Sequence, residues 1–180
     1  MPDTSFLSLL SFLLFCSVIF LSDYLFRRVP NNFLLIAIAL QLMCFFLQSK
    51  GLNGIGWSGA LFGLAGGLAF FLPLYALRAM AAGDVKFFAV LGFCLGFGAL
   101  LPIFLIASLI AAMHALVLYS SRLGIASNLQ LVATRMTRWR LFQWVLEKRG
   151  NRIGIPYAAY LALAAGWVGL QNAGMAPGFT

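Results

Sequence analysis

The chain is short of charge, and above all of acids. Charged residues make up 9% of the 180 positions, and only four of them are Asp or Glu. Hydrophobic residues reach 63%, and the mean hydropathy is +0.99. Soluble domains are about half apolar and about a quarter charged, and apolar surface on this scale is compatible only with lipid as the solvent. The shortage of charge therefore excludes a soluble domain and predicts an integral membrane protein.

Ligands for metals and partners for nucleophiles are equally scarce. His114 is the only histidine, and the three cysteines, Cys16, Cys44 and Cys94, lie in apolar runs without a C-x-x-C pair. A metal site would lack ligands, and a serine or cysteine nucleophile would lack a base. We therefore expect no cofactor and no metal. We interpret the cysteines as buried thiols and His114 as a structural residue that bonds to the backbone or to a neighbouring helix.

Apolar runs of about 20 residues predict membrane-spanning helices. Such runs cover residues 5–22, 32–48, 57–78 and 153–171, and a longer one covers 87–121. The longer run suits two spans, broken near a glycine cluster (Gly92, Gly96, Gly98) and Pro102. The first run lacks a small-x-small cleavage site, so we expect a retained helix rather than a signal peptide. The prediction is an all-α, polytopic single domain over 1–180 with six transmembrane helices, the fourth being short.

The cations favour one orientation. With six helices and both termini outside, every Lys and Arg except Lys50 faces the cytoplasm. We therefore predict a multi-pass protein of the inner membrane, and the net charge of +8 indicates lipid headgroups rather than nucleic acid. The basic loop over 122–152 repeats apolar residues at helical spacing. An interfacial helix on anionic headgroups is the simpler interpretation, with substrate docking as the alternative.

Two of the four acids lie at predicted cytoplasmic helix ends. Asp3 belongs to the terminal tail and Glu147 to the basic loop, which leaves Asp23 and Asp84 at the membrane face. Two carboxyl groups within about 3 Å share one proton, so one can activate a water while the other polarises a scissile carbonyl. Each aspartate alone also has a structural explanation: Asp23 could pair with Arg27, and Asp84 could cap a helix. Their joint position favours the pair.

Helix dipoles suggest a division of labour within that pair. Asp84 precedes the predicted fourth helix, whose N-terminus favours a carboxylate, whereas Asp23 follows the first helix, whose C-terminus disfavours one. The hypothesis is that Asp23 carries the shared proton and that Asp84 is the base.

Three short segments resemble the type IV prepilin peptidases. The segment RRVPNN at 27–32 follows Asp23, AAGDVK at 81–86 contains Asp84, and IPYA at 155–158 opens the last helix. They are similar to the family's Asp before an R-x-I-P-N stretch, its G-x-G-D-x-K loop and its late P-Y motif. The resemblance implies a membrane aspartyl endopeptidase that removes the short basic leader from prepilins or pseudopilins at the cytoplasmic face. The residues that carry over are Asp23 and Asp84 as the catalytic pair, with Gly83, Lys86, Pro30 and Asn31 as their support.

The chain departs from this pattern in two ways. Ala81 stands where the family motif has glycine, and an alanine suits that place only if the backbone needs no positive φ. The cysteine-bearing cytoplasmic segment of larger members is absent, so the chain resembles peptidase-only members that serve Tad/Flp pili or archaeal preflagellins, and we expect no methyltransferase activity. The alternatives are a non-catalytic scaffold or small transporter that uses the aspartates as ion-pair or proton sites, and a peptidase with another short-leader client.

Overall fold

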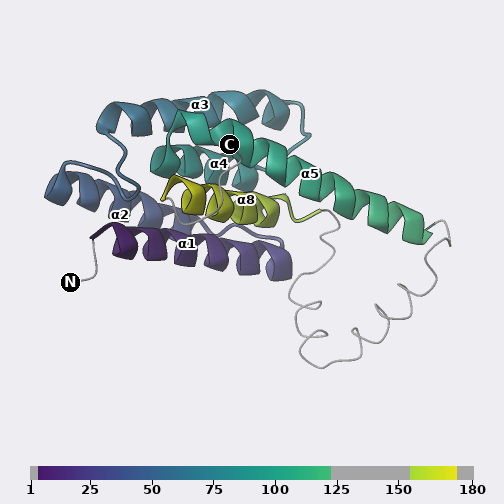
Figure 1. Cartoon of the computed structure of the whole chain (residues 1–180). Coiled ribbons are helices and arrows are strands. Elements are labelled where there is room, and N and C mark those ends of the chain that lie inside the picture. Colours follow the sequence, from purple (N-terminus) through teal and green to yellow (C-terminus); the bar gives the residue numbers. More distant parts are fainter. Residues whose placement is uncertain (1–3, 123–154, 174–180) are drawn as a thin grey trace.

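The computed structural model describes residues 4–122 and 155–173, which form six helices and no strand (Figure 1). The helices are α1 (Thr4–Phe26), α2 (Asn31–Gln48), α3 (Trp57–Ala76), α4 (Ala82–Leu95), α5 (Phe97–Arg122) and α8 (Tyr157–Asn172). The all-α prediction is confirmed for this part of the chain. The interfacial helix expected within 122–152 lies outside the described residues, apart from Arg122.

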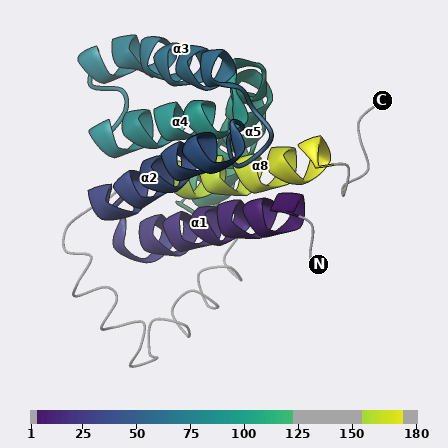
Figure 2. The same ribbon diagram turned by 90° about the vertical axis from the view of Figure 1, so that its left-hand side faces the viewer.

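Helix α4 is the centre of the bundle. It contacts α2, α3, α5 and α8, while α1 packs mainly on α8. Figures 1 and 2 both show α3 and α1 on opposite sides, with α4 and α8 between them. From Val85 onward every residue of α4 except Lys86 is buried. A helix that is apolar all round belongs in such a surrounded position, and α4 thereby fixes where its first turn, with Asp84, must lie.

The outer helices are suited to lipid. Four of them are long and apolar enough to cross a membrane, over Leu7–Phe26, Asn31–Gln48, Trp57–Ala76 and Phe97–Ser120. Their outward faces expose large apolar side chains such as Phe46, at 81%, which water would not tolerate over so wide a surface. At 14 and 16 residues, α4 and α8 are about 21 and 24 Å long. The chain is a multi-pass membrane protein, and the number of six crossings stays a prediction.

Several predicted helix boundaries need correction. Helix α1 continues to Phe26, so Asp23 lies in its last turn and does not follow it. Helix α2 starts at Asn31, one residue before the predicted run, and α4 starts at Ala82, five residues before it. Helix α3 ends at Ala76, two residues early, and α8 starts at Tyr157, four residues late. These differences arise because apolar composition marks the lipid zone, whereas caps and turns decide where a helix ends.

The break in the long apolar run lies at Gly96. This residue has a φ of 84°, a left-handed conformation that suits glycine, and its N–H donates to the carbonyl of Gly92 at 2.8 Å. Pro102 lies inside α5 instead. The predicted division into two helices is therefore confirmed, with the glycine rather than the proline as its cause.

Buried amides hold the far end of α4. Gln41 of α2 is fully buried; it donates to the carbonyl of Phe93 at 3.1 Å and accepts the N–H of Leu52 at 2.9 Å. Asn53 donates to the carbonyl of Cys94 at 3.2 Å. The last carbonyls of a helix have no partner within it, so these side chains replace the missing turn. They fix the position of α4 along the bundle, and with it the position of Asp84 at the other end of the helix.

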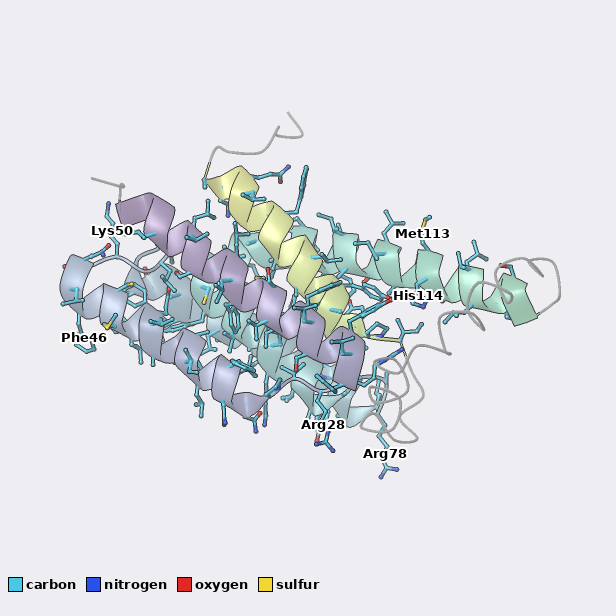
Figure 3. All side chains as sticks on the ribbon, turned by 90° about the horizontal axis from the view of Figure 1, so that it is seen from below. Arg28, Phe46, Lys50, Arg78, Met113 and His114 are labelled. Carbon is cyan, nitrogen blue, oxygen red and sulfur yellow. The ribbon has the colours of Figure 1, made fainter. Side chains whose placement is uncertain are left out.

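The charged residues separate along the bundle. Figure 3 shows Arg28 and Arg78 at one end, and Lys50 with Phe46 at the opposite end. We call these the basic end and the Lys50 end. The positive-inside rule expects cations to gather on the cytoplasmic side, so this separation agrees with a cytoplasmic basic end.

Candidate active site

Asp23 lies in the last turn of α1 at the basic end. It is 6% exposed, one of two polar or charged residues buried in the described part of the chain. Helix α1 ends because Arg27 takes a left-handed conformation, with a φ of 54°, and its N–H donates to the Asp23 carbonyl at 2.9 Å. The Ser22 hydroxyl donates to the Arg28 carbonyl at 3.1 Å. These bonds fold the chain back, so that Val29 and Pro30 pass beside Asp23.

Asp84 is the third residue of α4 and lies in its first turn, not before the helix as predicted. Its carboxyl accepts a backbone hydrogen bond from Ala81, the N-cap residue. An acid at this place reaches back to the cap N–H as in a capping box. Asp84 is therefore not itself the N-cap residue that the structural explanation foresaw, although its carboxyl serves the cap, and a second bond shows that this is not its only contact.

The N-terminus of α8 joins the two aspartates. The backbone of Ala158 donates to the Asp84 carboxyl, and the N–H of Ala159 donates to Asp23 Oδ2 at 3.0 Å. N–H groups in the first turn of a helix have no partner within it and attract negative charge. One helix end thus holds carboxyls from α1 and α4, and these are close enough to interact electrostatically.

A cavity of about 650 Å³ opens over this junction. All three sequence segments that carry the family resemblance contribute to it. The lining residues are Asp23, Arg27, Arg28, Val29, Pro30, Ala81, Gly83, Asp84, Ile155 and Tyr157. The structure therefore brings together segments that are far apart in the chain, as the predicted pair requires.

The four predicted supporting residues divide into two sets. Pro30 and Gly83 line the cavity. A Cβ on Gly83 would lie 3.3 Å from Val29 Cβ, which is tight, so glycine allows this loop to pack closely. Asn31 and Lys86 are exposed and are not among the lining residues. Their supporting role stays a prediction.

Ala81 has no need of glycine's freedom. Its φ is −79° and its ψ is 147°, an extended conformation that any residue adopts. The condition under which alanine suits this place is therefore met. We expect Ala81→Gly to leave kcat/KM for the predicted peptidase reaction near its wild-type value, because the backbone does not change. A large gain in kcat/KM would show that alanine distorts the loop.

The dipole argument for the shared proton gains a third helix end, which acts on both carboxyls. Asp23 does lie at the C-terminus of α1, but its carboxyl also faces the N-terminus of α8 through Ala159. The two aspartates thus share the N-terminus of α8, and only their own helices still distinguish them, since Asp23 lies in the last turn of α1 and Asp84 in the first turn of α4. Which one carries the proton stays a hypothesis.

Sequence reasoning missed the backbone donors of α8. The only signal for them was Pro156 in the IPYA segment, since this buried proline is the N-cap residue of α8 and lies just before the free N–H groups. The structural interpretation of His114 is confirmed: its Nδ1 bonds to the hydroxyl of Tyr160 on α8. Cys16 and Cys94 are buried thiols as expected, while Cys44 is only half-buried.

The comparisons with known proteins agree with this arrangement. The sequence profile of the type IV leader peptidase family (peptidase A24) matches residues 10–116, a stretch that contains Asp23, Asp84 and their loops. No curated protein and no solved structure matches the chain. The match covers more than half of the 180 residues. The chain belongs to the type IV leader peptidase family, and this membership implies aspartic-type prepilin peptidase activity.

Proposed function

We propose that the chain is a membrane aspartyl endopeptidase that removes the short basic leader of prepilin-like precursors, with Asp23 and Asp84 as its catalytic pair. The observation that carries the proposal is the meeting of both carboxyls at the α8 N-terminus, on one cavity. Family membership supports the reaction class. The proposal places the basic end, with this cavity, at the cytoplasmic face of the inner membrane and both termini outside.

The chemistry needs one proton shared between two carboxyls. The ionised aspartate takes a proton from a water, whose oxygen attacks the scissile carbonyl, while the protonated aspartate donates to the carbonyl oxygen. The tetrahedral intermediate then passes a proton to the amide nitrogen, and the C–N bond breaks. The pair is left with one proton, as at the start. The N–H of Ala159 holds Oδ2 of Asp23 and so orients that carboxyl at the cavity.

The cavity suits a short peptide segment at a membrane surface. Its volume of about 650 Å³ lies within the range of about 300–1,000 Å³ for ligand pockets, which is enough for a few residues in extended form. A cut at the basic end would leave the apolar part of a precursor in the bilayer. Precursors of type IV, Tad/Flp or secretion-system pseudopilins all fit this description.

The test is cleavage by the purified wild-type protein in liposomes, offered several short-leader precursors. We expect a mass loss equal to the leader in at least one of them, with no added methyl group on the product. If no short-leader precursor is cut while circular dichroism shows a folded protein, the proposed function is wrong. A scaffold or a small transporter would then be the better interpretation.

A further inference from the structure

The first turn of α8 orients both aspartates, so whatever fixes α8 also fixes the active site. Helix α8 packs between α1 and α5. Two tyrosines of α8 bond to side chains of α5. The Tyr157 hydroxyl bonds to Ser108 at 3.0 Å, and the Tyr160 hydroxyl bonds to Nδ1 of His114. The two tyrosines stand three residues apart, which puts them on one face of the helix. They flank Ala158 and Ala159, the two residues whose N–H groups hold the carboxyls.

The buried apolar contacts of α8 give it little directional hold. Its buried residues are mostly small: Ala158, Ala159, Ala162, Ala164, Ala165 and Gly169, with Leu161 and Val168 as the larger aliphatic ones. Apolar packing is non-directional, and alanine has no side-chain rotamer to lock a register. Hydrogen bonds are directional. The tyrosine bonds to α5 are therefore directional contacts that resist a slide or rotation of α8, in addition to the N–H bonds to the two carboxyls.

His114 has no evident task besides this bond. It lies on α5 among apolar neighbours and is half-buried, and Figure 3 shows it near the start of α8. A polar side chain at membrane depth is costly unless it is hydrogen-bonded. Tyr160 is 5% exposed and directly follows Ala159, whose N–H holds Asp23, so it stands beside the catalytic junction rather than at the lipid surface.

We infer that His114 and Tyr160 are positioning residues of the active site, which set the place of the α8 N-terminus and through it the geometry of Asp23 and Asp84. The inference rests on the proposed function. Neither side chain lines the cavity, so neither has to touch the substrate. Misplacement of a catalytic group by about 1 Å can cost about 10²-fold in rate, and a shift of this size is what a lost bond between α5 and α8 would permit.

The first experiment is Tyr160→Phe, which removes one hydroxyl and keeps the ring. We expect kcat for leader cleavage, corrected for folded protein, to fall by about 10-fold to 10²-fold, with KM near its wild-type value and a lower melting temperature in detergent, because His114 loses its partner. His114→Leu should do the same. His114→Asn should recover most of the rate, because its amide stands near the place of Nδ1. Tyr119→Phe removes an exposed hydroxyl from α5 and is the matched control.

The second readout does not depend on activity. The infrared carboxyl bands of the pair, assigned by difference from Asp23→Asn and Asp84→Asn, should shift in Tyr160→Phe and stay unchanged in Tyr119→Phe. Unshifted bands together with a wild-type kcat in Tyr160→Phe would overturn the inference. The inference would also be overturned if kcat fell equally in His114→Leu and His114→Asn and in proportion to the fraction of folded protein. If Asp23→Asn cleaves normally, the proposed function fails instead, and the band shift still decides the positioning role.

Discussion

Replacing either aspartate by asparagine is expected to lower kcat for leader cleavage by at least about 10³-fold. The amide neither accepts a proton from water nor donates one as an acid, so the shared-proton mechanism stops. The fold should survive, because the amide oxygen of Asp23→Asn can still accept the N–H of Ala159, and the amide of Asp84→Asn can do the same for Ala158. Initial rates of precursor cleavage in liposomes, corrected for folded protein, give the comparison.

The double variant sharpens this prediction. The effects on kcat of replacing residues that act as a unit do not add, so the double variant Asp23→Asn/Asp84→Asn should be no slower than the slower of the two single variants. Lys50→Gln removes a charge at the Lys50 end, far from the cavity, and is the control that should cleave normally (Figure 3). Two losses that multiply in the double variant would mean that the carboxyls act independently, which contradicts a single shared site.

Replacing Gly92 by valine is expected to unfold the bundle or nearly so. Helices α3 and α4 touch backbone to backbone: a Cβ on Gly92 would lie 2.2 Å from the Gly63 carbonyl oxygen, and one on Gly63 would lie 2.0 Å from that of Gly92. Gly67, one turn on, lies over the Ala89 backbone, where a Cβ would be 2.8 Å from its Cα. Small residues at four-residue spacing allow such close contact between membrane helices. A valine would force α3 and α4 apart.

The expected loss in stability is at or above about 3 kcal/mol, the upper part of the usual range for overpacking, because the obstacle is backbone rather than a flexible side chain. Activity should disappear as well, since α4 carries Asp84. Gly98→Val is the matched control, because a Cβ there meets nothing within 4 Å. Thermal unfolding in detergent compares the two. A Gly92→Val protein with a wild-type melting temperature would show that the α3–α4 contact is looser than described.

Much of the site could be predicted because it depends on rare residues. Acids are so few that Asp23 and Asp84 stand out, and each carries a recognisable segment beside it. The division of the long apolar run was also predictable, because the run is too long for one span and contains a helix-breaking residue, Gly96. Composition was sufficient for the all-α class, because lipid permits few other solutions.

The rest depends on groups that have no signature in the sequence. The donors to the two carboxyls are the backbone N–H groups of Ala158 and Ala159, and any residue type would supply them. The bond between Tyr160 and His114 depends on which helices are neighbours, which hydrophobic runs do not specify. The end of α1 at Phe26, beyond Asp23, follows from the left-handed turn at Arg27, a conformation that arginine seldom takes.

The most direct test of the shared aspartate site is leader cleavage in membranes that contain wild type, Asp23→Asn, Asp84→Asn, or both variants together. The structure places both carboxyls of one chain on one cavity, so wild type should cleave and the other three preparations should not. Cleavage by either single variant would show that its carboxyl is not required. Cleavage restored by the mixture would show that the two aspartates come from different chains, and either result would contradict a catalytic pair within one chain.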